Sequence, residues 1–297
     1  MSQSTIESES ALVSVIIPTM ASTERSVQLK RAIASIRQSS EHFVRIITVV
    51  NGARFDPAVC DWLKAQADVQ FEYVQKPSSP EAICRGLELV RTQFFSTLDD
   101  DDEYLPGATD LKLAALQAAP QADLLVSNFY EHKNGVDALM YDRLLAVPCA
   151  PLACLMRFPW LSSINAMYRR DSIDLAFFKD HHPYAEWTWL AFKLAMASKT
   201  VAVLDRPTAR YYDTPLSLSK SGAYFRAYVP LLEKMLKASP PAEIVPLIRK
   251  KMSAAYHDAS VAALRDGYRA EAWRAHWCSL VLKGGFRYLR YTRHLFK

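Results

Sequence analysis

Glycine is scarce in this chain: there are eight among 297 residues. No segment has the spacing GxGxxG or GxxxxGK[ST], which lets backbone amides surround a pyrophosphate. The loop after the first apolar run is instead Thr19-Met-Ala-Ser-Thr-Glu-Arg25. The sequence therefore argues against a glycine-lined phosphate cradle. A bound diphosphate would need a metal ion and basic side chains to balance its charge.

Long apolar runs and paired cysteines are also lacking. No stretch approaches the roughly 20 apolar residues that cross a bilayer, and the polar, acidic start MSQSTIESES does not resemble a signal peptide. The five cysteines are odd in number and scattered, and no second Cys or His pair completes a zinc signature beside Cys149 and Cys154. We therefore expect a cytoplasmic protein with reduced thiols.

The net charge of +5 is mild, and no broad basic face indicates a nucleic-acid partner. Positive charge gathers in residues 283–297, which contain no acid and interleave Lys, Arg and His with aromatic residues. Such a segment suits peripheral contact with the anionic inner face of a membrane. A helix packed on the domain with solvated cations explains it nearly as well.

Apolar, β-branched runs alternate with helical patterns over the first 130 residues. Strands are predicted at 13–18, 44–50, 69–74, 94–98 and 123–130, and helices at 27–38, 57–67, 80–90 and 107–119. This alternation predicts an α/β fold with a mostly parallel sheet flanked by helices. Beyond residue 131 the alternation is lost. A helix over 187–197, a strand over 200–204 and a helical region over 225–282 follow.

Four consecutive acids, Asp99 to Asp102, directly follow the apolar run that ends at Leu98. Crowded carboxylates repel one another, and a divalent cation among them removes that repulsion. Mg²⁺ and Mn²⁺ prefer carboxylate oxygens and share them with substrate phosphates. Because open α/β sheets bind ligands at the carboxyl edge of their strands, the run predicts a metal site there. A solvated acidic turn is the alternative.

Three segments together resemble a known family. Val-Ser-Val-Ile-Ile-Pro-Thr at 13–19, Val-Val-Asn-Gly at 49–52 and Leu-Asp-Asp-Asp-Asp at 98–102 are similar to the successive signatures of glycosyltransferase family 2, inverting sugar transferases with the GT-A fold. The resemblance implies a domain division, listed here from the N-terminus: a flexible segment 1–11, a GT-A domain 12–222 with a nucleotide-binding half 12–130 and an acceptor-binding half 131–222, and a helical C-terminal region 223–297.

The resemblance also implies roles for individual residues. Thr19 would border the nucleotide and Asn51 would lie near its base, although turn and capping chemistry explains both equally well. Asp99 and Asp101 match the family's DxD motif, with Asp99 toward the ribose and the metal and Asp101 on the metal, Mn²⁺ or Mg²⁺. Asp100 is a further candidate for contact with the nucleotide sugar.

An inverting transfer needs a general base for the acceptor hydroxyl. Family members carry an acidic pair before a tryptophan at the head of a helix. Here that segment is Tyr184-Ala-Glu-Trp-Thr-Trp-Leu190, so the resemblance assigns the base to Glu186 and leaves Ala185 where the family has another acid. A glutamate at a helix N-terminus is also favoured by the helix dipole, without any catalytic role.

The sequence thus predicts a metal-dependent hexosyltransferase. It would use a nucleotide-diphosphate sugar, with a UDP-sugar favoured, and a saccharide or lipid-linked glycan as acceptor, in surface polysaccharide biosynthesis. A catalytically degenerate relative that binds glycan or scaffolds an assembly remains open. A sugar nucleotidyltransferase is a weaker alternative, because it would need a glycine-rich, basic first loop.

Overall fold

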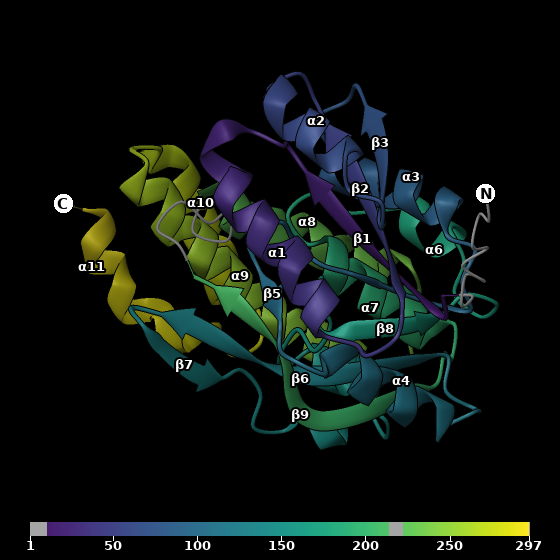
Figure 1. Ribbon diagram of the computed structural model, residues 1–297. Coiled ribbons are helices and arrows are strands. Elements are labelled where there is room, and N and C mark those ends of the chain that lie inside the picture. Colours follow the sequence, from purple (N-terminus) through teal and green to yellow (C-terminus); the bar gives the residue numbers. More distant parts are fainter. Residues whose placement is uncertain (1–10, 214–221, 297) are drawn as a thin grey trace, which may run out of the picture. The chain divides into compact units, whose positions relative to one another are not determined.

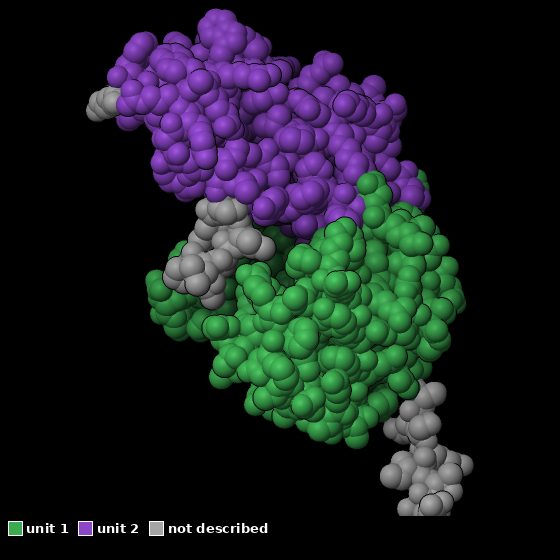
Figure 2. All heavy atoms as spheres, turned by 90° about the horizontal axis from the view of Figure 1, so that it is seen from above, with its two compact units in different colours: residues 1–149, 160–180, 198–213 green, residues 150–159, 181–197, 214–297 purple. Residues whose placement is uncertain are grey.

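The computed structural model describes residues 11–213 and 222–296 (Figure 1). Residues 1–10, which make up nearly all of the segment 1–11 predicted to be flexible, lie outside the described residues. Residues 214–221, just before the predicted boundary at 222, also lie outside them. The chain forms two compact units, coloured separately in Figure 2. Unit 1 comprises residues 1–149, 160–180 and 198–213, and unit 2 comprises residues 150–159, 181–197 and 214–297.

Unit 1 is built on a nine-stranded sheet in the order β3-β2-β1-β4-β8-β6-β9-β5, with β7 paired to β6. The first four strands in this order are parallel: β3 (Val69–Val74), β2 (Val44–Asn51), β1 (Val13–Thr19) and β4 (Phe94–Thr97). Every residue of β1 and β4 is buried. These apolar, β-branched strands are continuously buried because helices cover the sheet, as the sequence predicts.

The second half of the sheet adds antiparallel pairs and makes it mixed. Its strands are β8 (Ala166–Arg169), β6 (Leu124–Lys133), β9 (Val201–Tyr212), β5 (Glu103–Tyr104) and β7 (Val136–Leu139). Strand β8 pairs antiparallel to both β4 and β6, whereas β6 and β9 are parallel. The register of β6 and β9 shifts at Asn128, opposite Pro207. Strand β9 continues through this proline because a bulge needs no ladder hydrogen bond from it.

The helices of unit 1 follow the predicted positions closely. They are α1 (Ser26–Gln38), α2 (Pro57–Lys64), α3 (Ser79–Leu89), α4 (Ala108–Gln117) and the short α6 (Ala176–Lys179), with 3-10 turns η1 (Thr23–Arg25) and η2 (Leu144–Ala146). Helix α3 packs on β1 and β2. A Cβ atom at Gly86 would lie 2.5 Å from Cγ2 of Ile16, so this helix approaches β1 at a distance that only glycine permits.

Unit 2 is helical. Its elements are α5 (Pro151–Leu155), α7 (Glu186–Met196), α8 (Gly222–Lys237), α9 (Val245–Arg265), α10 (Arg269–Val281), η4 (Gly285–Tyr291) and α11 (Thr292–Leu295). Leu295 is buried against Ala263 and Ala272, so the end of the basic segment is anchored on α9 and α10. Among the described residues, no helix combines the length and apolarity that crossing a bilayer requires.

Candidate active site

Three predicted site residues meet at the carboxyl edge of the parallel strands in unit 1. Thr19 ends β1, Asn51 ends β2, and the acidic run follows β4. The Asn51 amide nitrogen donates to the Thr19 carbonyl at 3.0 Å, and the Thr19 hydroxyl donates to Asp100 Oδ2 at 2.7 Å. The neighbouring strands therefore place these side chains in one connected network, at the edge where α/β sheets bind ligands.

Arg25 is the cation of this network. Its guanidinium pairs with the Asp100 carboxylate and lies 3.2 Å from Asp101 Oδ2. Burial raises the pKa of Asp100, and the positive charge of Arg25 opposes that rise. Arg25 comes from η1, directly before α1, so the loop after β1 supplies a charged side chain to this edge of the sheet.

Asp99 is a buried acid of the candidate site with a strongly raised pKa. Its Oδ2 accepts a hydrogen bond from the Ser163 hydroxyl at 2.5 Å. Burial, reinforced by the negative charge of Asp101, raises the pKa of Asp99 to about 7. An acid with so much uncompensated repulsion is stabilised by any cation that binds beside it.

The last acid of the run has a structural role, as does the residue after it. The Asp102 carboxylate accepts a hydrogen bond from the Tyr212 amide at 2.9 Å, and the Asp102 amide donates to the Asp99 carbonyl at 3.2 Å. Glu103 pairs with Arg210 and accepts from the Tyr212 hydroxyl at 2.9 Å. These contacts fix the acidic turn to β9 and leave Asp99, Asp100 and Asp101 as the candidate ligand-binding acids.

The carboxylates suit a hard divalent cation. Within the described part of the chain, no group of three or more His, Cys, Asp and Glu side chains is arranged to hold a metal. Mg²⁺ sites, however, commonly use one or two carboxylates and complete the shell with water and substrate phosphate. Asp99 and Asp101 are the two carboxylates that the sequence predicts for such a site, and burial, followed by the negative charge of Asp101, raises the pKa of Asp99.

Glu186 lies in unit 2 as the first residue of α7. Its Oε1 accepts a hydrogen bond from the Tyr184 amide at 3.1 Å, across a turn in which Tyr184 has φ +64°. The next turn of the helix is buried, with Trp189 stacked on Phe192 at 5.4 Å. The carboxylate is therefore held at a rigid helix start, partly exposed. The first residue of α7 is a suitable position both for a general base and for a carboxylate that only stabilises the start of the helix.

The model of one protein family, described as "Glycosyl transferase family 2", matches residues 14–185. This match covers more than half of the chain and includes all the candidate residues of the sheet edge. The chain belongs to glycosyl transferase family 2. The family resemblance expected from the three sequence signatures is thereby confirmed. No curated protein matches the sequence significantly.

Solved structures of TarS share the fold. TarS of S. aureus, residues 1–349, is 14% identical and aligns with a TM-score of 0.59 over 96% of this chain and 92% of that chain. The same fragment in complex with UDP-GlcNAc aligns with a TM-score of 0.55 over 89% of this chain and 88% of that chain. The likeness confirms the predicted GT-A fold.

Two residues of this family 2 site escaped the sequence analysis. Arg25 lies 75 positions from its partner Asp100, and Ser163 lies 64 positions from Asp99. The one available signal for Arg25 was a basic residue in the loop after the first strand, at the same sheet edge as the acids. Ser163 carries no signal, since it comes from an irregular segment before β8. Arg85 on α3, in contrast, pairs with Glu72 of β3 and with Glu88 of α3.

Proposed function

We propose that this family 2 protein transfers a hexose, with inversion, from a UDP-sugar to a saccharide or lipid-linked glycan acceptor. The observation that carries the proposal is the network of Thr19, Asp100, Arg25 and Asp101 at the carboxyl edge of β1 and β4. It lies within the matched family region. The UDP-GlcNAc complex of the TarS fragment, which shares the fold, supports a uridine nucleotide as the donor.

Donor binding is assigned to the sheet edge. Thr19, Asn51, Asp99 and Asp100 would contact the nucleotide sugar, and Asp101 together with Asp99 would hold Mn²⁺ or Mg²⁺. The bound metal ion would neutralise the charge that develops on the leaving diphosphate. Asp99 is held by Ser163 and Asp100 by Thr19, so both carboxylates are oriented before the donor arrives, which lowers the entropic cost of binding.

Glu186 is assigned the role of general base. The acceptor hydroxyl gives its proton to the Glu186 carboxylate while its oxygen bonds to the anomeric carbon. The bond from that carbon to the diphosphate oxygen breaks, and UDP leaves. The Tyr184 amide donates a hydrogen bond to one oxygen of the Glu186 carboxylate and thereby orients the group that accepts the proton.

The setting we propose is surface polysaccharide biosynthesis in the cytoplasm, at the inner face of the membrane. Phe286, Leu289 and Phe296 are 84%, 56% and 76% exposed and alternate with the cations of the C-terminal segment. Exposed aromatic and aliphatic side chains among lysines and arginines suit contact with an anionic lipid surface, where a lipid-linked acceptor would be found.

The donor assignment is tested by thermal unfolding with UDP, with Mn²⁺ and with both together. A ligand that binds the folded state raises the melting temperature by mass action. We expect a clear rise only when UDP and Mn²⁺ are both present, and its loss in Asp101→Asn. The control is Asp61→Asn, which removes an acid that is 76% exposed on α2 and should leave the rise intact.

Sugar transfer is tested separately, by Mn²⁺-dependent release of UDP from a UDP-sugar. A metal-dependent shift with UDP and no turnover with a panel of sugars and acceptors would favour the degenerate binding module. A shift of equal size in Asp101→Asn would contradict the metal assignment. Absence of any shift with every nucleoside diphosphate tried would overturn the transferase proposal as a whole.

A further inference from the structure

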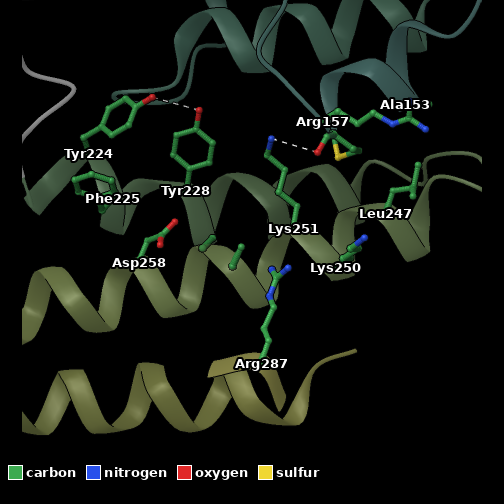
Figure 3. A pocket seen from close by; sticks show the side chains of 13 residues that line it. Ala153, Arg157, Tyr224, Phe225, Tyr228, Leu247, Lys250, Lys251, Asp258 and Arg287 are labelled. Atoms are coloured by element: carbon green, nitrogen blue, oxygen red, sulfur yellow. Dashed lines mark hydrogen bonds between the residues drawn. The ribbon is translucent and has the colours of Figure 1, made fainter. Parts of the chain in front are cut away.

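Unit 2 contains a cavity of about 660 Å³ that has no part in the proposed transfer chemistry (Figure 3). It lies between α8 and α9, with the end of α5 and the segment η4 completing its walls. A volume between 300 and 1,000 Å³ is typical of small-molecule sites. The lining residues are Ala153, Met156, Arg157, Tyr224, Phe225, Tyr228, Leu247, Lys250, Lys251, Ala254, Ala255, Asp258 and Arg287.

The wall of the cavity is largely apolar. Met156 comes from the end of α5, Phe225 from α8, and Leu247, Ala254 and Ala255 from α9. The two small residues on α9 leave room between the helices. A hydrocarbon chain or ring against this wall would be removed from water, which is favourable in proportion to the apolar area covered.

The charges on the cavity are unbalanced. Arg157, Lys250, Lys251 and Arg287 line it against one acid, Asp258. In the part of the chain that the structure describes, no carboxylate lies within 4.0 Å of the cationic group of Arg157, Lys250 or Arg287. Arg157, Lys250 and Arg287 are exposed, and lysines and arginines without a close carboxylate beside an apolar wall are suited to an anionic group.

The cations come from three separate elements. Arg157 follows α5, Lys250 and Lys251 lie on α9, and Arg287 extends from η4 toward the cavity (Figure 3). The Lys251 ammonium donates two long hydrogen bonds, to the carbonyls of Leu155 at 3.3 Å and Met156 at 3.4 Å, and burial lowers its pKa. An ammonium has three donors, so one remains for a bound anion.

The position of Arg287 connects the cavity with the exposed apolar surface. Arg287 lines the cavity, while its neighbours Phe286 and Leu289 on the same 3-10 segment are 84% and 56% exposed. A ligand that enters beside Arg287 therefore passes next to apolar side chains that water surrounds. This arrangement favours an amphiphile from a lipid surface over a free anion from solution.

We propose that this cavity binds one molecule of an anionic lipid with a phosphate headgroup. The phosphate lies among Arg157, Lys250 and Arg287, and the chain lies along the apolar wall formed by α8 and α9. The proposed lipid site does not depend on the proposed donor site, because the two are formed by different residues.

The test is isothermal titration of the full chain with three probes: short-chain dihexanoyl phosphatidic acid, dihexanoyl phosphatidylcholine and inorganic phosphate. Phosphatidic acid carries both the anionic headgroup and the chains and should bind with an affinity at least about tenfold above the other two. Phosphate binding as tight as phosphatidic acid would show a bare anion site and overturn the proposal. Equal binding of the two lipids would overturn it as well.

Matched variants locate the binding. Arg287→Gln should weaken phosphatidic acid binding by about tenfold, the loss expected for one charge-assisted contact. Arg290→Gln removes the same charge three residues later, outside the lining residues, and should leave the affinity unchanged. Equal losses in the two variants would indicate unspecific attraction and contradict the proposal.

A second pair of variants tests the apolar part. Ala254→Phe on α9 should fill the wall and weaken phosphatidic acid without changing the weak binding of inorganic phosphate. Lys250→Gln, at an exposed position of α9, repeats the charge test should Arg287→Gln fail to fold. Undiminished affinity for phosphatidic acid in both Ala254→Phe and Lys250→Gln would overturn the assignment to this cavity.

Discussion

In unit 1 the charged side chains at the sheet edge pair with one another, whereas in unit 2 the cations around the cavity face it without a close acidic partner among the described residues. Arg25 pairs with Asp100, and Arg210 pairs with Glu103. The paired edge has fixed geometry before any ligand binds, which suits chemistry that depends on orientation. The cations around the cavity of unit 2 are not neutralised by a close carboxylate among the described residues, which suits recognition of an anion.

The largest expected effect comes from replacing Glu186, the proposed general base in unit 2. Glu186→Gln should lower kcat by about 100- to 10,000-fold, the usual contribution of a positioned general base. The KM for the donor and the Mn²⁺-dependent rise in melting temperature with UDP should change little, because the donor site lies in unit 1. Steady-state kinetics of UDP release measures both quantities.

Two controls sharpen this result. Glu186→Asp retains a carboxylate and should recover part of the rate, while Glu233→Gln, which removes another acid of unit 2, should not change it. A loss below about tenfold in Glu186→Gln, together with a small loss of stability, would assign the residue to capping the start of α7.

The C-terminal segment offers the next largest effect. Leu295→Ala should lower the free energy of unfolding by about 2–5 kcal/mol, because it opens a cavity against Ala263 and Ala272. Phe286→Ser should leave stability nearly unchanged, because its ring is 84% exposed, and should reduce binding to anionic vesicles. Urea unfolding and vesicle co-sedimentation distinguish the two. Equal destabilisation would mean that the whole segment packs on unit 2.

Breaking the paired edge of unit 1 should have a moderate effect. Arg25→Met leaves Asp100 buried without its cation, and removing one partner of a buried pair is strongly destabilising. Since the Arg25 side chain is 40% exposed, we expect a loss of about 1–2 kcal/mol in the free energy of unfolding. Urea unfolding without divalent ions measures it, and Mn²⁺ should restore part of the loss.

Arg37→Met is the matched control. The Arg37 side chain is 39% exposed, but its partner Asp68 is 27% exposed, against 4% for Asp100. Surface pairs contribute about 0–1 kcal/mol, so this variant should lose less than Arg25→Met. Equal losses would show that the pairing at the sheet edge has no special weight for stability.

Lys112 of unit 1 is a buried cation whose ammonium has no hydrogen-bond partner among the described residues, and its expected effect depends on pH. It is fully buried on α4, its ammonium lies 3.9 Å from the Tyr104 ring centre, and burial lowers its pKa to about 7. The unfolded chain binds the Lys112 proton up to about pH 10, whereas the folded protein releases it near pH 7. Stability should therefore rise between these values, by at most about 1.4 kcal/mol per pH unit.

Lys112→Met should remove that rise. Its stability should exceed that of the original protein most at pH 7 and below, and the gap should narrow as pH increases. Urea midpoints between pH 6 and 10 measure this. Lys64→Met, at a lysine that is 54% exposed, should follow the original pH profile. A profile of Lys112→Met parallel to the original would contradict the lowered pKa.

The sequence predicted the first half of the fold well because each element there has a strong local pattern. The buried strands β1, β2 and β4 are continuous apolar runs. Helices α2 and α3 each begin with a capping residue and have a proline in the first turn, as in Asp56-Pro57 of α2. Strand β7 was not predicted, because all four of its residues are exposed. Strand β9 extends eight residues beyond the predicted end at Leu204, through a proline that only the bulge explains.

The candidate site was predicted in part for a similar reason. The acids and Thr19 follow strands, so the topology of parallel strands brings them to one edge, and the family signatures identify them. Arg25 and Ser163 contact the acids through the tertiary fold alone, and a single sequence contains no record of such pairing. The cavity in unit 2 was missed because its lining comes from α5, α8, α9 and η4, and α5 is far in the chain from the other three elements.

The close approach at Gly86 has a consequence for Thr19, the last residue of β1. Any side chain at position 86 would meet Ile16 and force α3 away from the sheet, tilting the strand whose final residue is Thr19. The hydroxyl of Thr19 would then move relative to Asp100. Gly86 thereby influences the alignment of Thr19 and Asp100, which are proposed to contact the donor. Replacing Gly86 by a larger residue should therefore lower the affinity for the nucleotide.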